Sequence, residues 1–477
     1  MFSFKIVLFL FKIKIMKKEI FAAAIVILFS LSALAQEISY NNWAIGNGGG
    51  LSFQNGNLIQ FQSQMACQDM GSTVSDATGN LLFYCNGTTV YNKNHAVMAN
   101  GTGLLGDITG GHAALILIQP ETKFYYIFTI DKYADNDGLR YHIVDISANG
   151  GLGEVITKNV VLMNPASEKI AAVWNQNQSC YKIITHKFGN NEFHVFELNN
   201  SGLNTTPVIS AIGNSHINGN YGQAHDALGQ LSISPNGNKV ALALCYSSLF
   251  EIFDFDINTG VLTNPLSFGA YPFAWGIEFS PNSQYVYFTQ WTLHKVYQAD
   301  ISSNDSSIII ASIIEVGNIP AAGQYSVGYL SRTPDNRIFI AKYGYGNLAS
   351  ISSPDSAGLA CNFDDAGITL QYGSSTAGLS CSPVFLNEIN TLKENNPYSF
   401  NLFPNPCNGN FTLLKRTVFS NALIKIFSLQ GDIVYAASLN DSKLNEVFET
   451  NLQAGVYFIS IKSANGELVN QKLIIAK

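Results

Sequence analysis

Short apolar segments separated by tight polar turns recur along residues 65–372. In these repeats a turn rich in Pro, Asp, Asn and Gly precedes a strand of alternating β-branched and aromatic residues, a pattern that predicts antiparallel hairpins. The six turn-and-strand segments are DATGNLLFYC (76–85), QPETKFYYIF (119–128), NQNQSCYKII (175–184), SPNGNKVALAL (234–244), SPNSQYVYFT (280–289) and TPDNRIFIAK (333–342). Their spacing is about fifty residues, the length of one four-stranded blade, so the chain is expected to be all-β and to contain a β-propeller.

The two ends of residues 40–386 determine the expected number of blades. The segment WAIGNGGGLSFQNGNLIQFQ (43–62) offers about three strands, and GLSCSPVFLN (378–387) resembles one further inner strand. If the two ends share a blade, no sheet edge remains open. We therefore favour seven blades, with six as the alternative.

The composition and the hydrophobic pattern of the sequence change after residue 386. Residues 387–399 are polar, include Pro397 and are expected to be a linker. Residues 400–477 contain about seven short alternating segments, which predict a small Ig-like β-sandwich.

Residues 1–35 have the pattern of a secretory signal peptide. Lys17 and Lys18 precede an apolar run, and Ala33 and Ala35 mark a cleavage site after Ala35. Ile20 to Ala35 is shorter than the roughly 20 residues of a membrane-spanning helix. Met16 is a second possible start. No later stretch is long and apolar enough to span a membrane, so the product is expected to be exported.

Composition narrows the function classes. The chain has 26 Lys plus Arg and 33 Asp plus Glu, a formal charge of −7, and only 12% of its residues are charged. Low charge excludes a coiled coil or a charged disordered protein, and the negative sign argues against nucleic-acid binding. Seven cysteines contain no C-x-x-C pair. Cys361 and Cys381 are the best candidates for a disulfide, and the remainder are expected to be buried thiols.

Residues 43–386 resemble a group of secreted Bacteroidetes propellers. The resemblance rests on WAIGNGGGLSF (43–53), GNLLFYCNGTTVYNKNHAVMANGTGLLG (79–106), GLRYHIVDISANGGLGEVITKNV (138–160), LFEIFDFDINTG (249–260) and ACNFDDAGITL (360–370). Ala44 stands where that group is expected to have tyrosine. The resemblance supplies no catalytic or ligand-binding residues.

Residues 400–477 resemble the type A C-terminal sorting domain of the type IX secretion system. The matching segments are NLFPNPCNG (401–409), IKIFSLQGDIVY (424–435), LQAGVYFISI (452–461) and QKLIIAK (471–477). The resemblance implies that the secretion machinery and its sortase act on the chain, which would reach the outer-membrane surface or the medium through the periplasm. The motif positions, which we expect to shape this domain, are Pro404, Asn405, Pro406, Gly409, Gly431, Gly455, Tyr457 and Lys477.

No sequence motif predicts catalysis. The chain lacks G-x-S-x-G, H-E-x-x-H and phosphate-loop motifs. Asp135–Gly138 resembles the start of a calcium loop, but Val144 stands where the closing acidic residue belongs. Asp364 and Asp365 offer a further weak possibility of Ca²⁺. We therefore predict no cofactor and no metal.

Propeller geometry indicates candidate ligand-binding positions. Residues just before each inner strand surround one mouth of the central channel, where ligands commonly bind. Alignment of the repeats places these residues there: His112, Lys169, His225, Asp226, Tyr271, Trp275 and Tyr325. Aromatic side chains with polar tips suit stacking against sugars or peptide side chains.

The sequence is compatible with three functions. We favour a binding module for a glycan or protein ligand, because no catalytic constellation is visible. A propeller-type enzyme such as a lactonase would need a ring of metal ligands, for which Glu168, Asp226 and Asn164 are candidates. A polysaccharide-degrading enzyme also stays open, whereas a sialidase is disfavoured because the propeller contains only three arginines. The third possibility is a structural surface or adhesion component.

Overall fold

A computed structural model describes most of the chain after residue 38. The described residues are 39–54, 57–217, 225–320, 327–386, 400–403, 407–415, 422–428, 431–439, 443, 445–462 and 468–476. The chain divides into two compact units, with the boundary between Leu386 and Asn387.

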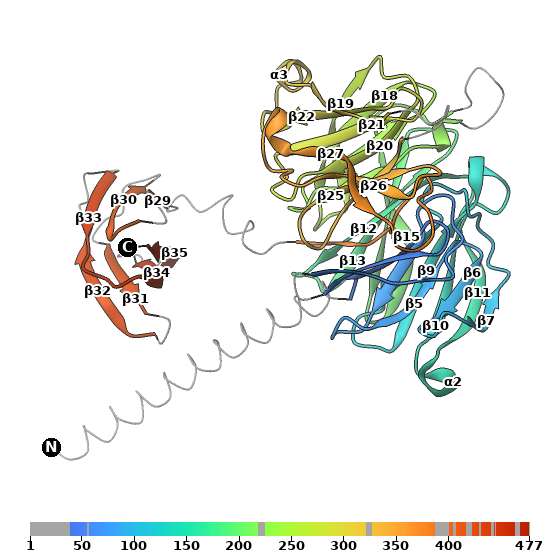
Figure 1. The fold of residues 1–477 in the computed structure, drawn as a ribbon, viewed down its shortest axis with the longest axis horizontal. Coiled ribbons are helices and arrows are strands. Elements are labelled where there is room, and N and C mark those ends of the chain that lie inside the picture. Colours follow the sequence, from blue (N-terminus) through green and yellow to red (C-terminus); the bar gives the residue numbers. More distant parts are fainter. Residues whose placement is uncertain are drawn as a thin grey trace. The chain divides into compact units, whose positions relative to one another are not determined.

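The first unit is a β-propeller (Figure 1). Six groups of four consecutive antiparallel strands form its blades, and the first two groups are joined by one parallel pair, Glu154 with Ala99. The first three blades are β4–β7 (Ser72–Ser75, Leu81–Cys85, Thr89–Asn92, Val97–Thr102), β8–β11 (Ala114–Ile118, Phe124–Ile130, Leu139–Asp145, Glu154–Met163) and β12–β15 (Ala166–Asn175, Cys180–Lys187, Glu192–Asn199, Gly202–Ala211). The next three are β16–β19 (Leu231–Ile233, Lys239–Leu244, Leu249–Asp256, Val261–Gly269), β20–β23 (Ala274–Phe279, Tyr285–Gln290, Lys295–Asp300, Ile314–Asn318) and β24–β27 (Val327–Arg332, Ile338–Lys342, Asn347–Ile351, Phe363–Thr369).

The polar turns of the repeats form the first hairpin of each blade. Between β4 and β5, the Asp76 carboxylate accepts hydrogen bonds from the backbone N–H groups of Thr78 and Asn80, each at 2.9 Å. This local bonding is why Asp favours such turns. The predicted second strands correspond to β5, β9, β13, β17, β21 and β25.

A seventh, three-stranded sheet closes the ring. It consists of β1 (Asn42–Ile45), β2 (Gly49–Gln54) and β3 (Asn57–Gln60). Trp43 packs against Phe339 of the last blade, with ring centroids 6.4 Å apart, and the Ala44 N–H bonds Thr73 Oγ1 of the first blade at 2.9 Å. The sheet therefore lies between the first and last blades, and the ring contains seven blades.

The fourth strand expected for this blade pairs elsewhere. The residues after β27 form a parallel bridge between Ser380 and Gly71, and then β28 (Val384–Phe385) pairs in parallel with β12. This segment, 377–385, passes from the first and last blades to the innermost strand of the third. The prediction that residues 378–387 join the β1–β3 sheet is wrong. The Gln60 side chain links the β1–β3 sheet to the last blade. Its Nε2 donates to Thr369 O at 2.9 Å, and its Oε1 accepts the Gln371 N–H at 2.7 Å.

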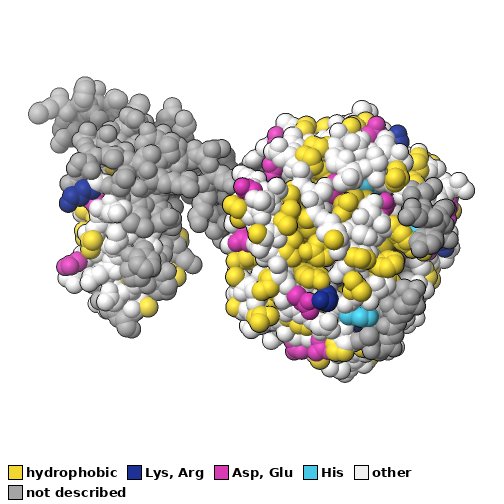
Figure 2. All heavy atoms as spheres, turned by 90° about the horizontal axis from the view of Figure 1, so that it is seen from above, with side chains coloured by type: hydrophobic (Ala, Val, Ile, Leu, Met, Phe, Trp, Pro, Cys, Tyr) yellow, Lys and Arg dark blue, Asp and Glu magenta, His cyan; other side chains and the backbone are white. Residues whose placement is uncertain are grey.

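The expected disulfide is also absent. All seven cysteines are buried and free. Cys361 packs with Tyr287 and Ile338, whereas Cys381 packs with Met70 and Trp275 in a different core cluster. The propeller core is apolar, and the surface in Figure 2 shows extended areas without charged side chains, as the low content of charged residues predicts.

The second unit is a small β-sandwich. One sheet contains β29 (Phe400–Phe403), β30 (Asn410–Lys415) and β33 (Asn445–Glu449). The other contains β32 (Ile433–Ser438), β31 (Leu423–Phe427), β34 (Gly455–Lys462) and β35 (Leu468–Ile475). Residues of both sheets, including Phe411, Ile426 and Ile461, form its core.

Two of the expected glycines occupy turns of this sandwich. Gly431 has φ +88° in the β31–β32 turn, and Gly409 has φ +111° before β30. Gly455 begins β34, where Tyr457 donates to Gln453 O at 3.0 Å. Pro404, Asn405, Pro406 and Lys477 lie outside the described residues, as do Ala33 and Ala35.

Candidate functional site at one end of the propeller channel

The antiparallel topology places two sets of segments at one end of the channel. The innermost strands β4, β8, β12, β16, β20 and β24 all begin at this end, and the loops after the second strands return to it. We call it the entry end.

Lys169 and Asp226 form hydrogen bonds with neighbouring segments of the protein at the entry end. Lys169, fully buried in β12, donates from Nζ to the carbonyl oxygens of Asp226, Ala227 and Leu228 at 3.0, 2.8 and 2.6 Å. The Asp226 carboxylate accepts from the backbone N–H groups of Tyr246 and Ser247 and from Ser247 Oγ. Both charged groups are thus engaged in hydrogen bonds within the protein.

His112 and Glu168 connect the second and third blades. His112 Nδ1 lies 3.0 Å from Glu168 O, and burial lowers the pKa of His112 to about 4, so its ring is neutral at pH 7. Glu168 Oε1 accepts the Tyr133 backbone N–H at 2.6 Å. Within the described residues Glu168 Oε2 has no hydrogen-bond partner, and burial raises the pKa of this carboxyl well above its usual value.

Asp69, which sequence reasoning missed, is a second buried acid at this end. It precedes β4, and burial raises its pKa to about 7. Asp69 and Glu168 interact electrostatically with each other and with Tyr329. Neither carboxyl forms an ion pair within the described residues, and burial shifts both toward the neutral, protonated form.

His225 and Trp275 have buried polar atoms that remain unused. Within the described part of the chain, His225 Nδ1 and Trp275 Nε1 have no hydrogen-bond partner, although the two residues are only 8% and 7% exposed. Tyr329 is fully buried in β24, and its hydroxyl lacks a well-aligned partner, although the Gly229 backbone is close. A buried polar atom without a partner is costly, which makes these positions functional candidates.

Aromatic residues on the loops after the second strands were not predicted. In five blades such a loop supplies a ring at the entry end: Tyr133, Phe188, Tyr246, Trp291 and Tyr343. The sequence does contain a pattern for them, namely an aromatic residue within three positions of the end of the second strand.

The loop rings and the inner-strand rings contact one another. The His225 ring lies 3.8 Å from Tyr246 and 5.8 Å from Tyr133, measured between centroids. Trp291 lies 4.4 Å from Trp275 and 6.1 Å from Tyr343. Tyr133 and Tyr343 are 39% and 40% exposed, so this aromatic cluster reaches the surface.

Tyr271, another predicted position, contacts a different set of rings. Tyr271 packs between two blades, because its ring lies 5.9 Å from Phe250 of β18 and 5.1 Å from Phe288 of β21. It lies three residues before β20. Tyr325 lies outside the described residues.

The suggested metal ligands do not assemble. The Asn164 amide donates to Asn136 O at 2.6 Å, and Asp226 is occupied as described above. In the described ranges, no group of three or more His, Cys, Asp or Glu side chains is arranged to hold a metal ion. Asp137 of the calcium-like loop pairs with Arg140 at 2.9 Å. Asp364 accepts the Ala366 N–H at 2.9 Å in its own loop.

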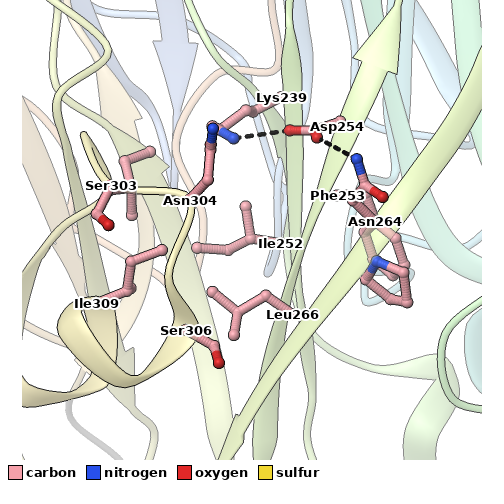
Figure 3. A pocket seen from close by; sticks show the side chains of 12 residues that line it. Lys239, Ile252, Phe253, Asp254, Asn264, Leu266, Ser303, Asn304, Ser306 and Ile309 are labelled. Atoms are coloured by element: carbon pink, nitrogen blue, oxygen red, sulfur yellow. Dashed lines mark hydrogen bonds and ion pairs between the residues drawn. The ribbon is translucent and has the colours of Figure 1, made fainter.

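A second hollow lies on the outer side of two blades (Figure 3). This groove of about 520 Å³ is bordered by β18, β19 and the short helix α3 (Ser306–Ala311). Its charged groups bind each other, because Asp254 accepts from Lys239 Nζ at 2.7 Å and from Asn264 Nδ2 at 2.8 Å. Of the described residues that line the groove, none has a buried side-chain polar atom without a hydrogen-bond partner.

The fold and the C-terminal sandwich define a β-propeller protein with a separate export tail. Residues 401–476 match the family described as secretion system C-terminal sorting domain, so the tail is a type IX sorting domain. The tail implies export to the cell surface or the extracellular space. Among the described residues, no helix has the length and hydrophobicity needed to cross a membrane.

Solved propeller structures resemble the chain at low identity. The periplasmic gluconolactonase PpgL of Pseudomonas aeruginosa is 9% identical, with a TM-score of 0.37, over 76% of this chain and 94% of that one. The Dos1 propeller is 11% identical, with a TM-score of 0.41, over 70% and 82%. Kluyveromyces lactis Hsv2p is 9% identical, with a TM-score of 0.38, over 71% and 96%. These similarities say nothing about activity, and no curated protein matches the chain significantly.

Proposed function

We propose that this exported propeller is a binding module that takes a glycan at its entry end. The observation that supports the proposal is the aromatic cluster around Trp275 and Trp291, which contains partly exposed rings and unpartnered polar atoms. Flat rings provide stacking surfaces, and a few placed polar groups fix orientation, which is the usual composition of a ligand site.

A binding role suits the chemistry of the cluster better than catalysis. Of the charged side chains expected at the mouth, Lys169 and Asp226 are occupied by structural hydrogen bonds. The groups without a hydrogen-bond partner in the described residues include an imidazole nitrogen, an indole N–H, a phenol hydroxyl and a carboxyl oxygen. Such groups can exchange hydrogen bonds with sugar hydroxyls.

A glycan array tests the proposal. The chain lacking residues 1–35 is applied beside Tyr343→Ala, Trp275→Phe and the control Phe458→Ala. Tyr343 and Phe458 are similarly exposed, at 40% and 45%, but Phe458 belongs to the C-terminal sandwich. We expect saturable binding that weakens about tenfold or more in Tyr343→Ala and is unchanged in Phe458→Ala.

The Trp275→Phe variant separates stacking from hydrogen bonding, because phenylalanine keeps a ring and removes the N–H donor. We expect weaker binding with retained folding. A blank array together with capture of one surface protein would replace the glycan by a protein ligand. Binding that is equal in all four proteins would place the site elsewhere.

A further inference from the structure

We propose a second binding site, for a small organic monocarboxylate, in a cavity inside the propeller channel. Arg332, Ser380 and Ser382 line this cavity, and each has a buried polar atom without a hydrogen-bond partner in the described residues. The site is separate from the glycan site proposed above and does not depend on it.

The three unpartnered groups are suited to a carboxylate. Arg332 presents Nη1, and the serines present hydroxyl groups, all of which can donate hydrogen bonds. Ser380 is only 3% exposed, so its unused hydroxyl is costly unless a ligand or water bonds it. A guanidinium with hydroxyl neighbours matches the planar oxygen pair of a carboxylate.

Arg332 Nη1 forms an ion pair with Glu278 Oε1 but no hydrogen bond with it. The two side chains approach only to 3.6 Å, while Glu278 Oε1 accepts from Ser232 Oγ and from the Phe279 N–H, each at 2.8 Å. Burial is the largest influence on the pKa of Glu278 and raises it. The guanidinium is therefore available to an anion.

The rest of the cavity wall favours a ligand with a short apolar body. Ile170, Leu231 and Val384 line it, and its volume is about 80 Å³. A single water needs roughly 10–15 Å³ by this measure, so a group of a few heavy atoms fits.

The polar corner of the cavity, formed by Arg332, Glu278, Ser380 and Ser382, lies away from the entry end. Glu278 and Arg332 stand near the C-terminal ends of β20 and β24, whereas the entry end is where these strands begin. The side chains of Arg332 and Glu278 are 18% and 11% exposed, so the corner reaches solvent. Because Ser380 and Ser382 belong to the crossing segment 377–385, a bound carboxylate would join this segment to the blades.

Acetate and acetamide form a matched pair of probes, with one shape and different charge. Melting temperatures and calorimetric affinities are measured at pH 7 and constant ionic strength on the chain lacking residues 1–35. We expect acetate, and not acetamide, to raise the melting temperature saturably. We expect Ser382→Ala to weaken acetate binding about tenfold, and Arg332→Gln to abolish it.

Arg337→Gln is the control, because Arg337 pairs with Asp335 at 2.6 Å in an exposed turn outside the cavity. Retained acetate binding in Arg337→Gln supports the site. An equal shift with acetamide, an unchanged shift in Ser382→Ala and Arg332→Gln, or no binding of acetate would overturn it. Ser382→Ala keeps the test decisive if Arg332→Gln folds poorly.

Discussion

Deletion of residues 400–477 is expected to leave the propeller in the periplasm. Those residues form the separate sandwich, and 401–476 match the secretion sorting family. The propeller forms its own compact unit, which ends at Leu386, so the truncated chain should still fold. The measurement is an immunoblot of periplasm, outer membrane and medium from cells that produce full-length or truncated protein.

A fusion provides the matching test of sufficiency. Residues 387–477 joined to a periplasmic fluorescent protein should bring that protein to the cell surface or the medium. If the truncated chain reached the medium as efficiently as the full chain, the tail would not be the export signal.

Gly328→Ala is expected to lower the free energy of unfolding of the propeller by about 3 kcal/mol. A Cβ at Gly328 would overlap the carbonyl group of Ala377, in the segment that crosses to the far side of the channel. The Tyr329 N–H bonds the same carbonyl at 2.8 Å, so neither backbone can move without loss of this contact. Denaturation followed by tryptophan fluorescence isolates the effect, because all four tryptophans lie in the propeller.

Gly346→Ala in the same blade is the matched control. A Cβ there meets nothing within 4 Å, so stability should change by less than about 0.5 kcal/mol. Equal stability of the two variants would contradict the described path of residues 377–385.

The repeats predicted the blades because their information is local. An Asp or Asn in the turn bonds its own backbone, and alternating apolar residues select the strand, as at Asp76 and β5. The pairing of the last segment was not predictable in this way. The apolar residue Val384 gives the sequence pattern of an inner strand. Its partner β12 is some two hundred residues away in the sequence and comes beside it only when the ring closes.

The candidate site was predictable in position and not in chemistry. Alignment of the repeats singled out Trp275 and Lys169, and these residues lie in the inner strands β20 and β12. The alignment could not show that the Lys169 ammonium donates to three backbone carbonyls, because those carbonyls belong to residues 226–228, almost sixty residues away in the sequence. Nor could it show that Tyr271 packs between two blades, because its ring partners lie in β18 and β21.

Hydrogen exchange with and without bound oligosaccharide tests the central claim, that the entry end binds ligand. The full chain lacking residues 1–35 is measured with the strongest ligand from the array and with an array sugar that does not bind. We predict ligand-dependent protection in loops 131–138, 245–248 and 291–294, which surround the aromatic cluster. Protection confined to the outer strands of the blades or to residues 400–477 would contradict the claim.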